Sequence, residues 1–197
     1  ETVNGQKTEE DVMSVVTENT ASQTEITASD AEQEAPLPIG TTFQVNDIIY
    51  QVTANTDTLE VAAKDISIAA TELILPEIVT HEGVTYQVTS ILDGGFQRRY
   101  RLQKIVLPEG LRTVGSSAFR FCNGVKELHL PSTLETFCKE GFQSLETITL
   151  ADGNQAFQLI DGVLFSKDGS ELKLYPSAKA ESSYNIPEGT KIVNRGT

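Results

Sequence analysis

Apolar and polar residues alternate in three short segments near the middle of the chain. The segments are LQKIVL (102–107), VKELHL (125–130) and LETITL (145–150), and each has apolar residues at its first, fourth and sixth positions. Side chains two residues apart lie on the same side of a strand. Each segment therefore predicts a short strand with one buried face. The opposite, outward face would carry Lys104, Val106, Glu127, His129, Thr147 and Thr149.

The residues around these segments recur at intervals of 23 positions. Phe96, Phe119 and Phe142 are in register, and each follows a small residue, namely Gly95, Ala118 and Gly141. The third strand segment arrives three residues early, because GFQS replaces AFRFCNG. A fixed period in the twenties is typical of a solenoid, in which each coil covers the apolar edge of the next. We expect the three phenylalanines to stack in the interior and the small residues to allow close packing beside them.

One coil resembles a known repeat. Residues 102–122, LQKIVLPEGLRTVGSSAFRFC, are similar to the pattern L-x-x-I-x-L-P-x-x-L-x-x-I-G-x-x-A-F-x-x-C of the BspA-type (Treponema-type) leucine-rich repeat, with Val114 in place of Ile. The next coil departs further, since Phe137, Cys138 and Gly141 replace Ile, Gly and Ala. The flanks ELILPEIVTHEGVTYQVTSI (72–91) and LIDGVLFSKDGSELKLYP (159–176) resemble the first segment and the hairpin insert of such proteins.

The resemblance covers roughly residues 40–197 and implies the fold class. It implies an α/β-type solenoid that is mostly β, a right-handed leucine-rich-repeat coil with short parallel strands, an N-terminal β cap and a β-hairpin insert. We divide the chain accordingly. Residues 39–90 are the β-rich cap, 91–150 the leucine-rich repeats, 151–185 the hairpin insert, and 186–197 the start of a further, truncated repeat. The next phenylalanine in register would fall just past Thr197, so we expect the natural chain to continue.

Residues 1–38 differ from the rest in composition. They hold nine acidic residues against one lysine, are rich in Thr, Ser and Glu, and contain no aromatic residue. Such a segment has too little apolar surface to offset its ordering entropy, which predicts a flexible acidic tail. The charge run is explained either by solubility or by an acidic tail that binds a partner.

Net charge and hydropathy exclude several classes of partner. The net charge is −13, of which the tail carries −8, and the pI is about 4.5. Nucleic-acid binding requires clustered Lys and Arg, so nucleic acid and anionic membrane surfaces are poor candidates. The sequence has no apolar run close to the roughly 20 residues that a membrane-spanning helix needs.

No motif for catalysis, a cofactor or a metal is present in the sequence. We find no G-x-S-x-G, H-E-x-x-H, P-loop or G-x-G-x-x-G. Asp161-Gly162 and Asp168-Gly169 are expected hairpin turns rather than acid–base pairs. The chain has two cysteines, Cys122 and Cys138, and whether they form a disulfide is left open.

Two surfaces are candidate ligand sites. The first is the outward strand face defined above, which is either an ordinary solvated face or a ligand-binding one. The second is FQRRYR (96–101), where a basic and aromatic island interrupts an acidic protein; its residues are Arg98, Arg99, Tyr100 and Arg101. These arginines either pair with neighbouring carboxylates or bind an acidic partner or glycan through charge-assisted and cation–π contacts.

The resemblance implies a function class. Proteins of this repeat type are largely secreted or surface-exposed bacterial proteins, and attachment to host proteins or other cells has been ascribed to several. The leading hypothesis is thus a non-enzymatic, extracellular protein-binding or adhesion module of a bacterial cell-surface protein. Its partner would be a host or neighbouring-cell surface protein or glycan. An architectural spacer within a larger surface protein and an accessory domain of a secreted enzyme are the alternatives.

Overall fold

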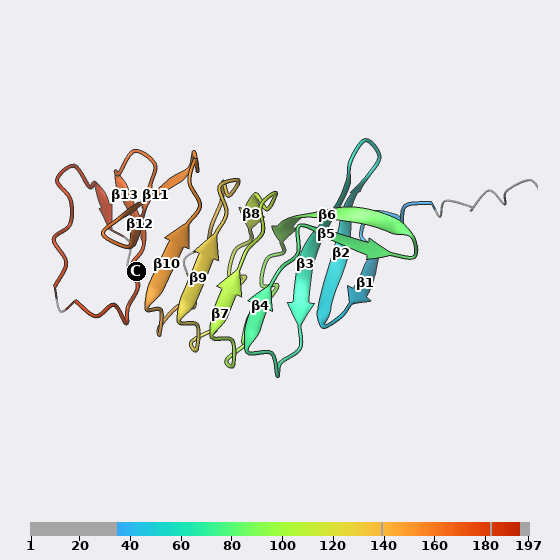
Figure 1. Ribbon diagram of the computed structural model, residues 1–197, viewed down its shortest axis with the longest axis horizontal. Helices are drawn as coiled ribbons and strands as arrows, with labels where there is room; N and C mark the ends of the chain where they lie inside the picture. Colours follow the sequence, from blue (N-terminus) through green and yellow to red (C-terminus); the bar gives the residue numbers. More distant parts are fainter. Residues whose placement is uncertain (1–34, 139, 182, 194–197) are drawn as a thin grey trace, which may run out of the picture. The chain divides into compact units, whose positions relative to one another are not determined.

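The computed structural model of the protein describes residues 35–138, 140–181 and 183–193 (Figure 1). Strands and turns make up this part of the chain, and it contains no helix. The strands form three sheets. Most of the predicted acidic tail lies outside the described residues, and so do the last four residues of the predicted truncated repeat.

The predicted outward-facing strands form a parallel ladder. Its order is β10-β9-β7-β4, with bounds β4 (Glu72–Ile74), β7 (Lys104–Val106), β9 (Glu127–Leu130) and β10 (Thr147–Leu150). Lys104 lies opposite Glu127, 23 positions later, and Glu127 lies opposite Thr147, 20 positions later. The early arrival of the third strand in the sequence therefore shortens one coil and leaves the register of the ladder intact.

β4 begins the ladder inside the segment that we assigned to the cap. It pairs with β7 in parallel, with Glu72 opposite Lys104 at a separation of 32 positions. The first coil is longer because it contains the antiparallel pair β5 (Ile78–His81) and β6 (Val84–Ile91). Because of this extra hairpin, β4 does not fall in register when the sequence is aligned at 23-residue steps, and its equivalence to β7 could not be recognised in that alignment.

The second sheet joins the N-terminal strands to the coils. The strands β1 (Thr42–Val45), β2 (Ile48–Asn55) and β3 (Leu59–Ile66) pair antiparallel in sequence order. β3 then pairs in parallel with β6, and β6 with β8 (Thr113–Val114). A bridge between Thr113 and Thr136 carries this pairing into the next coil. The solenoid thus has two parallel ladders. The first is formed by β4, β7, β9 and β10, and the second by β3, β6, β8 and the bridge to Thr136.

The third sheet follows the last rung of the first ladder. Its antiparallel strands are β11 (Phe157–Ile160), β12 (Val163–Ser166) and β13 (Glu171–Leu174), and β14 (Ile192–Val193) pairs with β13 in parallel. Asp161 and Gly162 both have positive φ, 48° and 76°, as a tight two-residue hairpin turn requires. The predicted hairpin insert is present, while the boundaries between the five segments stay predictions.

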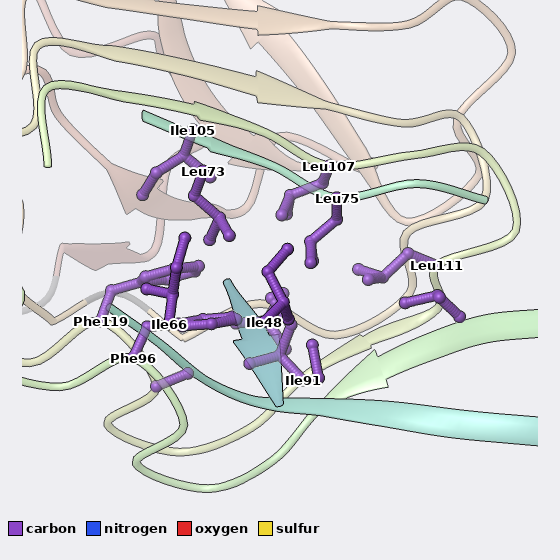
Figure 2. Packing of buried hydrophobic residues seen from close by; sticks show 14 of the residues in the cluster. Ile48, Ile66, Leu73, Leu75, Ile91, Phe96, Ile105, Leu107, Leu111 and Phe119 are labelled. Carbon is purple, nitrogen blue, oxygen red and sulfur yellow. The ribbon is translucent and has the colours of Figure 1, made fainter. Parts of the chain in front are cut away.

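The stacked phenylalanines form the centre of the core. The ring centroids of Phe96 and Phe119 are 5.8 Å apart, and those of Phe119 and Phe142 are 5.6 Å apart. Figure 2 shows Phe96 and Phe119 across the interior from Leu73 and Ile105, which point inward from the first ladder. All of these side chains are buried. The stacking that the 23-residue period predicts is therefore confirmed.

The small residue before each phenylalanine is required by backbone packing, most clearly at Gly141. A Cβ atom on Gly141 would lie 1.8 Å from the carbonyl oxygen of Phe119, and its φ of +105° also favours glycine. Gly95 is less crowded, since a Cβ there would lie 3.1 Å from Ile91 Cγ2. The close approach that we expected from the sequence is present at both positions.

Asn154 links the third sheet to the solenoid. It is buried, and its Nδ2 donates to the carbonyl oxygens of Pro131 and Leu134, at 3.1 and 2.9 Å. Its Oδ1 accepts hydrogen bonds from the backbone N–H groups of Ala156 and Phe157, at 2.9 and 2.7 Å. One side chain therefore satisfies backbone groups on both sides of the junction, which offsets the cost of burying an amide.

Candidate functional site

The outward face of the first ladder contains two rows of side chains in register. Residue pairing places Glu72, Lys104, Glu127 and Thr147 in one row, and Ile74, Val106, His129 and Thr149 in the other. We call these eight residues the ladder face. The alternation of buried and accessible positions along each strand puts them outside, while Leu73, Ile105, Leu128 and Ile148 are buried beneath them. The six strand positions that the sequence nominated thus share one surface.

Four polar side chains of the ladder face, Lys104, Glu127, His129 and Thr149, are paired with one another. Lys104 Nζ lies 3.2 Å from Glu127 Oε2, and His129 Nδ1 lies 2.7 Å from Thr149 Oγ1. Hydrogen bonding from Lys104 is the largest cause that lowers the pKa of Glu127, which is a carboxylate at neutral pH. His129 Nε2 is shielded from solvent without a hydrogen bond, and it lies 3.5 Å from Glu127 Oε2, its ion-pair partner when the ring is protonated.

The apolar end of the ladder face contains a residue that the sequence reading missed. Ile74 is 58% exposed and lies opposite the partly buried Val106. Its position in ELIL, between the buried Leu73 and Leu75, has the same alternation as the other strands. That alternation was the available signal, but the irregular spacing of β4 removed Ile74 from the repeat alignment.

The residues of the basic island have separate roles in the turn before β7. Arg99 is intramolecular: its guanidinium pairs with Asp65 and donates to the carbonyl oxygens of Ile66 and Gln97, at 2.7 and 3.1 Å. This agrees with the first of our two readings of the island. Tyr100 is 55% exposed and Arg101 is also exposed.

Arg98 lies on the surface with an aromatic neighbour from the next coil. Its Cζ is 6.0 Å from the centroid of the Phe121 ring, and Cζ of Arg120 is 5.0 Å from the same centroid. Arg98 and Phe121 occupy equivalent places in successive coils, and both have positive φ. The island therefore belongs to the turns between the strands of successive coils.

The cysteines of the chain are free thiols. Cys122 is buried, its Sγ lies 3.0 Å from the carbonyl oxygen of Phe96, and burial raises its pKa to about 11. Burial also raises the pKa of Cys138. Neither thiol is thus a thiolate at neutral pH, and both have the properties of packing groups rather than nucleophiles.

The part of the chain that the structure describes holds no group of three or more His, Cys, Asp or Glu side chains arranged to bind a metal ion. Nor does it contain a helix of the length and hydropathy needed to cross a membrane.

The repeat family matches more than half of the chain. The BspA type leucine rich repeat region matches residues 83–185 in six copies. The chain belongs to the BspA-type leucine-rich repeat family. The resemblance of residues 102–122 is therefore confirmed at the level of the family, and so is the predicted leucine-rich-repeat solenoid, which in the described residues consists of strands and turns without the helices that an α/β-type label allows. A comparison with curated proteins found no match to this leucine-rich repeat chain.

A solved structure with a TM-score above 0.5 supports the fold, and two others are similar to parts of the chain. A leucine-rich repeat protein from Bacteroides ovatus is 20% identical, with a TM-score of 0.52, and the alignment covers 77% of this chain and 37% of that one. The pneumococcal vaccine antigen PcpA is 21% identical, with a TM-score of 0.40, over 79% of this chain and 61% of that one. A leucine rich cell surface protein from Faecalibacterium prausnitzii is 14% identical, with a TM-score of 0.34, over 78% and 66%. The chain thus spans well under two thirds of the Bacteroides ovatus structure.

Proposed function

We propose that this leucine-rich repeat chain is a non-enzymatic, extracellular binding module of a bacterial cell-surface protein. In this proposal the ladder face presents Ile74, Val106 and His129 to a protein ligand. Family membership supports the class of protein, and the geometry of the ladder face supports the location of the contact. By binding a protein on other cells or on host tissue, the module would contribute to attachment of the bacterium.

The observation that carries the proposal is the exposed Ile74 in register with Val106. A single exposed isoleucine is ordinary, but here the adjacent rung continues the apolar strip and charged pairs lie beside it. In protein interfaces, truncation of a few well-packed anchor residues commonly removes most of the affinity, so the apolar end of the ladder face is the part to test. The neighbouring polar groups are paired within the face, which favours a surface contact over a reaction centre.

A binding screen with matched variants tests the location. The full chain would be immobilised and probed with host matrix and cell-surface proteins, and the variant Ile74→Ser/Val106→Ser compared with Ile78→Ser. Ile78 is 57% exposed but belongs to β5, outside the ladder. We expect the double variant to weaken binding at least tenfold and the control to retain it. Equal loss in both variants, or none in either, would refute the ladder face as the contact.

The localisation is tested on intact bacteria. If the protein is at the cell surface, an antibody raised against the chain should label unpermeabilised cells. If the protein is secreted, the same antibody should detect it in the culture supernatant. Labelling only after permeabilisation would contradict the proposal. Surface labelling without any protein ligand in the screen would favour the architectural spacer.

A further inference from the structure

A cleft lies between the N-terminal strands and the turn that follows β6. Its volume is about 680 Å³, within the range of small-molecule sites. Its lining comes from β1, β2, β3 and the 92–99 turn, which are distant in sequence and separate from the ladder face. The side chains that matter here are Thr42, Lys64, Asp93, Gln97 and Arg98.

The two carboxylates of the cleft, Asp65 and Asp93, are bound to other groups of the protein. Two of its cationic side chains, Lys64 and Arg98, have no carboxylate partner in the described part of the chain. Asp65 pairs with Arg99, and Asp93 Oδ1 accepts a hydrogen bond from the backbone N–H of Ser116 at 2.7 Å. Lys64 and Arg98 are exposed. Within the described residues, the side chains of these two form no ion pair or hydrogen bond with the protein. The cleft therefore offers two positive charges to a ligand, in a protein whose net charge is −13.

The remaining lining groups favour a polyhydroxylated ligand. The Thr42 hydroxyl and the Gln97 amide donate and accept hydrogen bonds, and the second oxygen of Asp93 is an acceptor for hydroxyl donors. Ile49 and Leu92 add apolar wall, against which the C–H groups of a sugar ring can pack. The negative charge of Asp93 disfavours a doubly charged phosphate, while it suits a ligand that carries one anionic group and several hydroxyls.

We propose that this cleft binds a carboxylated sugar unit of a glycan. The sugar carboxylate is bound by Lys64 and Arg98, and its hydroxyls are bound by Asp93 and Gln97. This site is independent of the ladder face, so the two proposals can fail separately. A module with both sites would contact protein through the ladder and acidic glycan through the cleft.

Titration calorimetry on the full chain tests the chemistry of the ligand. Glucuronate is the probe, glucose is its neutral counterpart, and glucose 6-phosphate carries the same ring with a dianionic group. We expect glucuronate to bind at least tenfold more tightly than either. Equal binding of glucose would remove the charge argument, and preferential binding of the phosphate would contradict the role of Asp93. Absence of glucuronate binding at millimolar concentration would overturn the proposal, as would preferential binding of a glutamate-rich peptide.

Two variants and a matched control test the position. Arg98 has φ of +61°, a conformation that asparagine tolerates, so Arg98→Asn removes the charge without new backbone strain. We expect Arg98→Asn and Lys64→Gln each to reduce glucuronate affinity about tenfold or more, because a charge-assisted hydrogen bond is lost. Lys191→Gln makes the same change in net charge on an exposed residue outside the cleft lining and outside the basic island, and should bind as the wild type does. Similar weakening in Lys191→Gln would assign the effect to overall charge and refute the site.

Discussion

Phe119→Ala is expected to be among the most damaging single substitutions in the core. The side chain has no exposed surface and contacts a phenylalanine on each side, at centroid separations of 5.8 and 5.6 Å. Truncating a buried phenylalanine costs about 3–5 kcal/mol, and two lost aromatic contacts place this one at about 4–5 kcal/mol. For a domain of this size, that corresponds to a melting temperature lower by about 10–15 °C.

Phe121→Ala provides a matched control two residues away. Phe121 is 39% exposed, and two arginines make cation–π contacts with its ring at 5.0 and 6.0 Å, each worth about 0.5–1 kcal/mol at such a site. We expect it to cost about 1–2 kcal/mol. Urea denaturation followed by far-ultraviolet circular dichroism measures both variants. A loss in Phe119→Ala no larger than that in Phe121→Ala would refute the view that the phenylalanine stack stabilises the coils.

Three further predictions concern backbone packing, thiol reactivity and pH. Gly141→Ala should destabilise by at least about 3 kcal/mol, whereas Gly153→Ala, with positive φ but open space around it, should cost about 1–2 kcal/mol in the same denaturation assay. Because burial raises the pKa of Cys122 to about 11, iodoacetamide at about pH 8 should label it only after denaturation; peptide mass spectrometry that detects labelled Cys122 in the native protein would contradict this. Hydrogen bonds from Ser166 and Ser170 lower the pKa of Asp168 to about 2. Its stabilising contribution should therefore be full above about pH 4, the ordinary aspartate pKa, and be lost as pH falls towards 2. Comparing urea midpoints of the wild type and Asp168→Asn across this range checks the sign, and a difference that grows at low pH would contradict it.

Most of the candidate site could be nominated from the sequence because strand alternation is a local rule. Lys104, Glu127 and Thr147 occupy equivalent places in their strands, and parallel pairing in register brings them to one row. The mutual pairing of Glu127 with Lys104 and His129 could not be read in this way, since it depends on which rung lies next to which. The cleft beside Arg98 was also beyond sequence reasoning, because its walls come from strands separated by dozens of residues.

Repetition of apolar residues along the chain was sufficient to determine the coil, the stacked phenylalanines and the need for a small residue at position 141. A coil that covers its neighbour requires the same apolar positions in every turn, so this information is written locally and repeatedly. Only the tertiary structure decided that β4 is the first rung, that Arg99 is tied to Asp65, and that Asn154 joins the insert to the solenoid. Each of these depends on one long-range contact, which occurs once and therefore leaves no periodic trace in the sequence.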